Sequence, residues 1–380
     1  MAAVLPADVV RGSGRGAACG PGFGVRAAAV GRAAGVRVVV VGASGNVGTA
    51  VLRRLAAEPA VDSVVGVARR PPVGAGDPYD TASWQAADIA APDATARLTE
   101  VVAGADAVVH LAWRLQPSWD VEVLERVNVG GSRAVLDAVL AAGVPQLVYS
   151  SSIGTYAASP DDRRRDESWP STGIATSTYS VQKAAVERML DELDAARLTV
   201  LRVRPAIVLQ PAAAGEIARF FLGPFVPTSL LRPALLRLLP WPRGLRGQIV
   251  HADDLADAMV RGLLARIDGG LNVATEPPLT RSVVAEVLGA KAFDVPTAAV
   301  RALVSGSWRV HLQPTDPGWI DMAASVPVMD TGRARSLGWA PRHPTDQVLA
   351  DFLAALADGR GSGSPALAPR RAVSGRRPGR

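Results

Sequence analysis

One feature restricts the possible folds of this chain more than any other: a buried-strand pattern followed directly by a glycine-rich loop. Residues 36–41 read VRVVVV, apolar apart from one arginine, and residues 42–48 read GASGNVG. Such a run is typical of a strand covered on both faces of a parallel sheet. Residues 46–57 then have a helical pattern, and glycine permits the tight turn between strand and helix. The sequence therefore predicts a strand–turn–helix unit.

The same alternation of strand and helix continues along the chain. Further strands are predicted at 62–68, near 87, at 106–111, 146–150 and 198–204, with helices over 119–142 and 179–195. This β–α alternation predicts an α/β fold, a Rossmann-type doubly wound parallel sheet. After Pro205 the pattern becomes irregular and rich in proline, with helices at 252–265, 280–289 and 345–357 and a strand at 271–275. We interpret this part as a smaller C-terminal lobe at the carboxyl edge of the sheet, where such folds bind ligands.

The glycine loop has the spacing and context of a dinucleotide-binding loop. Gly42 permits the turn, Gly45 lets the backbone approach a pyrophosphate, and Gly48 allows close packing of helix on strand. The start of the helix supplies free N–H groups and the positive end of a dipole. The residues expected to hold the dinucleotide here are Gly42, Ser44, Gly45, Asn46, Val47 and Gly48.

The end of the second strand bears on which dinucleotide binds. An acidic residue there normally bonds a free ribose 2′-hydroxyl, but this chain has Ala68-Arg69-Arg70. Because arginine can pair with a 2′-phosphate, the sequence favours NADP, with Arg69 as the expected contact. NAD is the alternative if the two arginines are only solvated.

A second group of residues has the pattern of proton-transfer chemistry. Tyr179 and Lys183 in YSVQK are four residues apart and so share one helical face. An ammonium beside a phenol favours the phenolate, so we expect the pKa of Tyr179 to fall toward neutral pH. Only two lysines occur among 41 basic residues, which argues that Lys183 is not an ordinary surface residue. Ser152 follows the strand 146–150, where its hydroxyl could bond a substrate oxygen.

With these motifs in order, the chain resembles the extended short-chain dehydrogenase/reductase family, the NAD-dependent epimerase/dehydratase group. The resemblance covers about residues 36–290 and rests on VVVVGASGNVG, Asp88-Ile89, HLAW (110–113), NVGGS (128–132), LVYSSSIGTY (147–156), YSVQK, LRVRPAIV (201–208) and HADDLADAM (251–259). It implies a Ser152/Tyr179/Lys183 catalytic site. It also implies that Asp88, Ile89, Leu111, Ala112, Asn128, Lys183 and Pro205 contact the cofactor.

The leading hypothesis is an NAD(P)-dependent oxidoreductase that transfers a hydride between nicotinamide and a carbonyl or secondary alcohol of a small metabolite. One alternative is a nucleotide-sugar epimerase or dehydratase with tightly bound NAD, with Arg219, Arg232, Arg237, Arg243 and Arg246 as candidate diphosphate contacts. Another is a non-catalytic dinucleotide-sensing regulator. Trp113 and the segment IVLQP (207–211) depart from the family pattern and could shape the substrate pocket. Other aromatic candidates for its wall are Trp119, Trp169, Phe220, Phe221, Phe225 and Trp241.

Composition sets the remaining expectations. Residues 1–35 and 359–380 mix Ala, Gly, Ser, Pro and Arg without a periodic apolar face, so we expect two disordered tails. Between them we expect a dinucleotide-binding domain over 36–205 and a substrate-binding lobe over 206–358, with segments returning to the first domain. The tails carry net charges of +3 and +6, which leaves −3 of the formal +6 for the body.

We interpret the arginines of the tails as solvated rather than as nucleic-acid-binding. The single cysteine excludes a disulfide framework, the four histidines have no metal-ligand spacing, and no signal peptide or membrane span is expected. The sequence thus indicates a cytoplasmic enzyme that could form a homodimer and that needs no metal.

Overall fold

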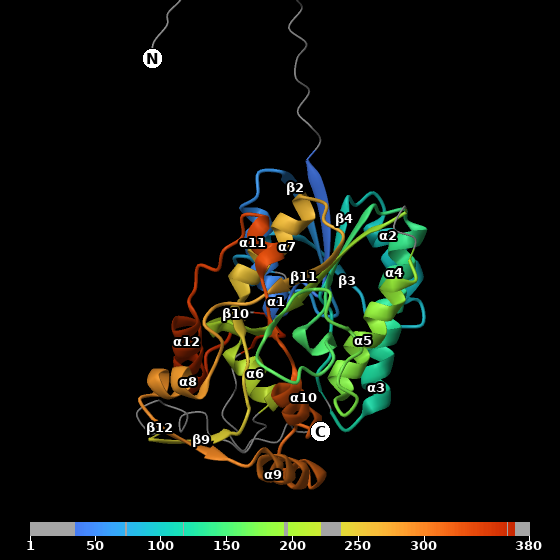
Figure 1. Ribbon diagram of the computed structural model, residues 1–380. Helices are drawn as coiled ribbons and strands as arrows, with labels where there is room; N and C mark the ends of the chain where they lie inside the picture. Colours follow the sequence, from blue (N-terminus) through green and yellow to red (C-terminus); the bar gives the residue numbers. More distant parts are fainter. Residues whose placement is uncertain are drawn as a thin grey trace, which may run out of the picture. The chain divides into compact units, whose positions relative to one another are not determined.

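Seven parallel strands form the central sheet in the order β11–β7–β5–β4–β1–β2–β3 (Figure 1). The computed structural model describes residues 35–72, 74–116, 118–193, 197–221, 237–362 and 364–368. The strands of the sheet are β1 Val36–Val41, β2 Val61–Ala68, β3 Ser83–Ala86, β4 Ala107–His110, β5 Gln146–Ser150, β7 Thr199–Pro205 and β11 Gly269–Val273. The strand order reverses between β1 and β4, so the ends of these two strands frame a crevice at the carboxyl edge.

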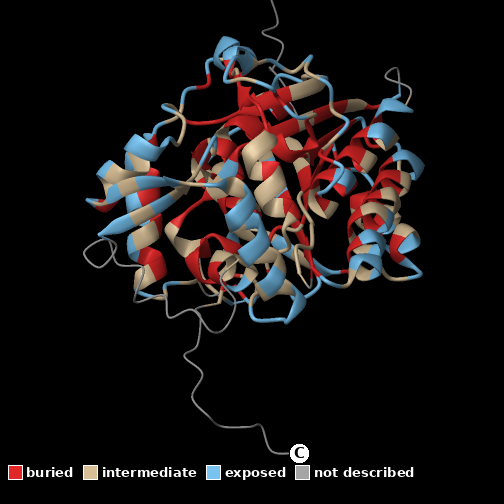
Figure 2. Cartoon of the chain, turned by 60° about the horizontal axis from the view of Figure 1, so that its bottom comes forward, coloured by how far each residue is buried: buried red, intermediate tan, exposed pale blue. Residues whose placement is uncertain are grey.

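Helices cover both faces of the sheet. One face packs against α1 Asn46–Ala56, α7 Ala252–Leu264 and α11 Gly332–Ser336. The other packs against α2 Ala94–Val102, α4 Gly131–Ala141 and α5 Thr178–Asp191. Figure 2 shows the inner strands of the sheet buried between helices whose outer faces are exposed, while the edge strand β3 is itself largely exposed. The predicted doubly wound parallel sheet is confirmed.

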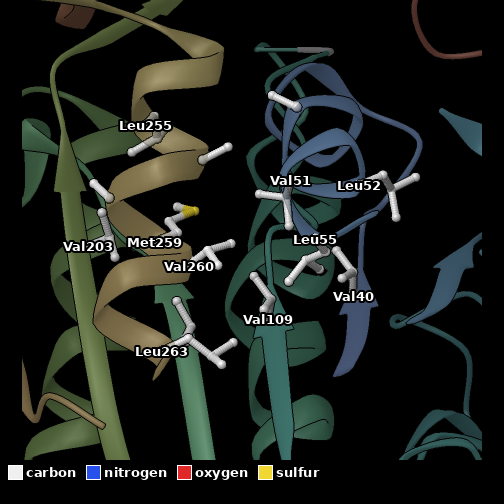
Figure 3. Close-up of a cluster of buried hydrophobic side chains, with 14 of the residues drawn as sticks. Val40, Val51, Leu52, Leu55, Val109, Val203, Leu255, Met259, Val260 and Leu263 are labelled. Carbon is white, nitrogen blue, oxygen red and sulfur yellow. The ribbon is translucent and has the colours of Figure 1, made fainter. Parts of the chain in front are cut away.

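The valine run of β1 explains why this strand lies at the centre. Val38, Val39 and Val40 are each 0% exposed, because alternate side chains point into the two helical layers. On one of these faces, apolar side chains of α1 and α7 meet those of the strands (Figure 3). Residues drawn there include Val40, Val109 and Val203 from the sheet with Val51, Leu52, Leu55, Leu255, Met259, Val260 and Leu263 from the two helices.

The helix predicted over 119–142 has an interruption. It consists of α3 Val121–Glu125, a π-helical turn η2 Arg126–Gly130 and α4. A π turn inserts an extra residue into the helical repeat and is frequent at functional sites. Here it turns Asn128 inward, where the side chain is 1% exposed.

Apart from α7, β11 and α11, which belong to the sheet and its helical layer, the described chain after Pro205 forms a second group of elements beyond the carboxyl edge. It comprises β8 Ile207–Leu209, α6 Ala214–Phe221, β9 Leu238–Pro242, β10 Ile249–His251, α8 Arg281–Leu288, β12 Lys291–Val295, α9 Thr297–Arg309, α10 Gly318–Ser325, β13 Val328–Met329 and α12 Thr345–Ala357. β13 pairs with β6 Arg164–Arg165, which precedes α5. Within the described residues, no helix is both long and apolar enough to cross a membrane.

The stretch after α12 differs from the expected disordered tail. Residues 360–368, apart from 363, pack against the glycine loop and α6. The hydroxyl of Ser364 donates to the carbonyl of Ser44 at 2.7 Å, and Arg219 donates to two backbone carbonyls of this segment, those of Ala366 and Ala368. Ser364 and Leu367 are both 0% exposed. Composition alone missed this docking because the partners are supplied by distant parts of the chain. The rest of both predicted tails, residues 1–34 and 369–380, lies outside the described residues.

We therefore expect truncation after Gly359 to lower the melting temperature and weaken dinucleotide binding, because it removes the segment that bonds to the glycine loop. Truncation after Ala368 keeps all the contacts described above and is the matched control. Thermal unfolding and a fluorescence titration with NADPH measure the two effects. Identical melting temperatures and affinities for the two truncated proteins would contradict the docking.

Candidate active site at the carboxyl edge of the sheet

A cavity of about 290 Å³ extends from the glycine loop to α5, α6 and α10. The residues predicted for the site that line it are Gly42, Gly45, Asn46, Val47, Gly48, Leu111, Ser152, Tyr179, Lys183 and Pro205. They come from the ends of four adjacent strands and from two helices. The fold therefore brings the predicted dinucleotide loop and the predicted catalytic residues onto one cavity.

The three glycines of the loop answer to different constraints. Gly42 has φ +91°, and a Cβ there would lie 2.6 Å from the backbone nitrogen of Ala112. A Cβ on Gly48 would lie 2.4 Å from the carbonyl oxygen of Gly42. The protein itself thus requires glycine at both positions, the first for the turn and the second for close packing of α1.

Gly45 is different, because the surrounding protein does not require it. Its φ is −85°, and a Cβ would meet only the Gly42 carbonyl oxygen, at the ordinary distance of 3.6 Å. The added atom would enter the cavity. Gly45 is also the N-cap of α1, whose first turn receives no side-chain cap, so the amides there are free to bind an anion. This cradle fits the pyrophosphate of a dinucleotide.

The other predicted cofactor residues lie around this loop but off the cavity wall. Arg69 is exposed just past the end of β2. Asp88 is exposed and accepts a hydrogen bond from the amide of Ala90, whereas Ile89 is 7% exposed and fills the space beside Gly131. The backbone of Ala112 packs against Gly42. The carbonyl of Ser44 accepts a hydrogen bond from the hydroxyl of Ser364.

The Asn128 side chain is bonded to other protein groups rather than open to the cavity. Its amide oxygen accepts from the backbone nitrogen of Arg114 at 2.7 Å. Its amide nitrogen donates to the Arg114 carbonyl at 2.9 Å and to Gln182 at 2.8 Å. All of these contacts are internal, so Asn128 ties the loop after β4 to α5 and does not line the cavity.

Ser152 and Tyr179 meet where β5 ends and α5 begins. The Ser152 hydroxyl accepts from the amide of Gly154 at 3.0 Å. A Cβ on Gly154 would lie 3.0 Å from the ring of Tyr179, so the glycine lets this ring approach the serine. Burial raises the pKa of Tyr179 to about 12, opposed by a hydrogen bond with Ser152. The phenol is therefore protonated at neutral pH.

Lys183 lies one turn further along α5, but it does not act on Tyr179 as expected. Its ammonium donates to the carbonyl of Ser150 at 2.7 Å and lies 3.6 Å from the ring centre of Trp113. It is 6.0 Å from the ring centre of Tyr179. Burial lowers the pKa of Lys183, opposed by Glu187. The predicted lowering of the Tyr179 pKa is thus wrong for this structure, because helical spacing does not specify which way the ammonium points.

A buried ion pair behind these residues was not predicted. Glu187, four residues after Lys183, is 0% exposed and binds the guanidinium of Arg204, which is 5% exposed, with Nε and Oε1 2.8 Å apart. Ser151 donates to the same carboxylate, and Arg204 also donates to the hydroxyl of Tyr156 at 3.0 Å. The sequence did contain a signal for Glu187: it lies four residues after Lys183 and eight after Tyr179, so it shares their helical face.

Apolar and aromatic side chains form the far wall of the cavity. Of the aromatic candidates, Trp113, Phe220 and Phe221 line it, while Trp119, Trp169 and Trp241 do not and Phe225 lies outside the described residues. Sequence reasoning missed Trp319, whose ring lies 4.8 Å from that of Tyr179, and Glu216.

None of the four described arginines considered for a diphosphate lines the cavity. Arg219 is engaged with the C-terminal segment, and Arg246 forms an ion pair with Asp162 at 2.9 Å. Arg237 and Arg243 do not line the cavity, and Arg232 lies outside the described residues. Over the described part of the chain there is also no group of His, Cys, Asp or Glu that could hold a metal ion.

The glycine loop allows a paired test. Gly45→Ala should leave the melting temperature nearly unchanged but weaken NADPH binding at least severalfold, because the methyl group enters the pyrophosphate cradle. Gly48→Ala should destabilise the protein, because its methyl group would overlap the backbone. Thermal unfolding and fluorescence titration separate the two. Unchanged NADPH affinity in Gly45→Ala would show that no pyrophosphate binds there.

Comparison with known proteins agrees with this geometry. The NAD dependent epimerase/dehydratase family model matches residues 38–274, more than half of the chain. The uncharacterized protein y4nG of Sinorhizobium fredii is 25% identical over 283 residues, covering 71% of this chain and 69% of that protein. A decarboxylating sterol-4-alpha-carboxylate 3-dehydrogenase of Saccharomyces cerevisiae is 31% identical over 109 residues, 28% of this chain and 31% of that enzyme.

The fold has solved counterparts as well. The crystal structure of the Thermus thermophilus UDP-glucose 4-epimerase in complex with NAD has a TM-score of 0.61 at 22% identity, covering 84% of this chain and 99% of that chain. The family match runs from β1 to just past β11 and so includes the whole central sheet. The chain therefore belongs to the NAD-dependent epimerase/dehydratase family, and it is an enzyme of the extended short-chain dehydrogenase/reductase type.

Proposed function

We propose that this enzyme is an NADP-dependent reductase of ketones carried on an apolar, ring-containing substrate. The observation that carries the proposal is the apolar part of the cavity lining. It is built from Trp113, Phe220, Phe221, Trp319 and Met322 and, among the described residues, offers no arginine. Among the described residues of that lining, the phosphates of a diphosphate-bearing sugar would find no cationic partner. The local similarity to a sterol dehydrogenase also supports an apolar substrate.

Different residues of the site could supply the different functions that carbonyl reduction needs. The substrate oxygen would lie between the hydroxyls of Ser152 and Tyr179. Ser152 would stabilise the developing negative charge on that oxygen, and the protonated phenol of Tyr179 would supply its proton. When bound along the glycine loop, the reduced nicotinamide would supply the hydride.

Lys183 has a role in orientation as well as charge. The Ser150 carbonyl and the Trp113 ring hold its ammonium at the cavity wall, where it could donate to the nicotinamide ribose after a small movement. The aromatic wall would keep water away from the reacting carbonyl. A dry site strengthens each of these polar interactions.

The proposed preference for NADP rests on Arg69 and Arg70. Val67 accepts from the amides of Gly42 and Ala43, so the chain just beyond it lies beside the glycine loop. Both arginines are exposed there. A 2′-phosphate at the adenosine end could pair with either guanidinium.

Replacing Tyr179 by Phe tests the catalytic proposal. The variant keeps the ring and its packing but removes the hydroxyl that would donate the proton. Turnover should fall by roughly 10²–10⁴-fold while NADPH binding persists. Tyr79→Phe is the control, since the Tyr79 hydroxyl bonds that of Thr49 at 3.1 Å and the residue does not line the cavity. A wild-type rate of ketone reduction by Tyr179→Phe would rule out the assigned role.

Replacing both Arg69 and Arg70 by Ala tests cofactor choice. The wild-type protein should bind NADPH at least severalfold more tightly than NADH, and the double variant should lose that preference by weakening NADPH alone. Arg281→Ala/Arg309→Ala, at two exposed positions on α8 and α9, controls for the loss of net charge. Equal NADPH and NADH affinities in the wild-type protein would contradict the proposal.

A further inference from the structure

Glu216 places a carboxyl group in the apolar part of the cavity. It lies in the first turn of α6, a helix otherwise dominated by small and apolar residues, and is followed by Phe220 and Phe221 on the same wall. Among the described residues that line the cavity, it is the one acidic side chain. Lys183 is the one basic side chain among the same described residues.

No donor among the described side chains and amides satisfies this carboxyl group. The nearby charge is that of Arg219 on the same helix, but its guanidinium donates to the carbonyls of Ala366 and Ala368, at 2.7 Å in both cases. Glu216 is partly buried, and a carboxyl group that loses water without gaining a hydrogen-bond donor costs free energy. A donor supplied by a bound molecule would offset that cost.

We propose that Glu216 recognises a second polar group of the substrate, remote from the reacting carbonyl, that donates a hydrogen bond: a hydroxyl or an ammonium. This inference rests on the proposed function of the same cavity. In the proposed reaction, Ser152 and Tyr179 bind the reacting oxygen. The ring of Trp319 lies 4.8 Å from that of Tyr179 and 4.9 Å from that of Phe221 on α6, so a substrate held there would extend along this aromatic wall toward α6. The carboxylate oxygens of Glu216 would accept a hydrogen bond from a donor on that substrate. A substrate carboxylate at that point would be repelled.

The charge of Glu216 would make the recognition depend on pH. Burial raises the pKa of its carboxyl to about 7, opposed by Arg219. The other titratable groups around it are Tyr179 and Lys183, which also line the cavity, and Arg360, whose carbonyl accepts from the amide of Gly215. An ammonium ligand should bind more tightly as pH rises through about 7, because the carboxylate then carries its full charge. A hydroxyl ligand should show a smaller change.

Four phenyl ketones that differ only at the para position test the proposal. They carry methyl, hydroxymethyl, aminomethyl or carboxylate groups, and their binding to the full-length protein saturated with NADP⁺ is measured by calorimetry. The aminomethyl ketone should bind about tenfold more tightly than the methyl ketone, as expected for a charge-assisted hydrogen bond. The hydroxymethyl ketone should be intermediate and the carboxylate weakest.

Two variants separate charge from hydrogen bonding. Glu216→Gln should lose the preference for the aminomethyl ketone, together with the pH dependence of that preference. It should keep the preference for the hydroxymethyl ketone, because the amide oxygen still accepts a hydrogen bond. Glu216→Leu should lose both preferences, bind the methyl ketone at least as well, and melt no lower than the wild type. Glu286→Gln, at an exposed position of α8, is the control.

The outcomes distinguish this inference from the proposed function. A wild-type protein that binds the four ketones equally, or a preference that persists in Glu216→Leu, overturns the role of Glu216 alone. Binding of none of the four overturns both proposals. Donor-dependent binding together with full activity of Tyr179→Phe supports Glu216 and overturns the proposed catalytic step.

Discussion

The buried ion pair between Glu187 and Arg204 is the interaction on which the site depends. Arg204 belongs to β7 and Glu187 to α5, so the pair fixes this helix to the sheet. Tyr179 and Lys183 lie two turns and one turn before Glu187 on the same face, and their placement follows from that anchor. Both charges are almost wholly removed from water. Removing one would leave the other uncompensated, which typically costs about 3–5 kcal/mol.

The cavity above this anchor combines polar groups with an apolar wall. Ser152, Tyr179 and Lys183 line it from the end of β5 and from α5, and Glu216 lines it from α6. The glycine loop forms a third side, and Gly45 leaves room there that only a ligand can use. The apolarity of the described part of this wall is the basis on which we propose an apolar carbonyl compound rather than a charged nucleotide sugar as the substrate.

Local patterns predicted the parts of this arrangement that depend on neighbours in the chain. The β1 valine run, the glycine spacing and the Tyr179–Lys183 interval are all short-range signals, and the structure brings these residues together. What they could not predict depends on contacts between distant residues. Examples are the pairing of Glu187 with Arg204, the rotation of Lys183 toward Ser150 and the docking of Ser364 on Ser44. Each needs the folded sheet to bring the partners together.

Net hydride transfer from a dinucleotide to a ketone in this cavity is the step that defines the proposed enzyme. To detect it, the enzyme is incubated with NADPH deuterated at the transferable C4 position and with whichever phenyl ketone binds most tightly, and the product is analysed by mass spectrometry. We expect an alcohol with one deuterium on the carbinol carbon and one NADP⁺ formed per alcohol. Bound ketone that yields no deuterated alcohol, together with nucleotide-sugar epimerisation that consumes no NADPH, would contradict it.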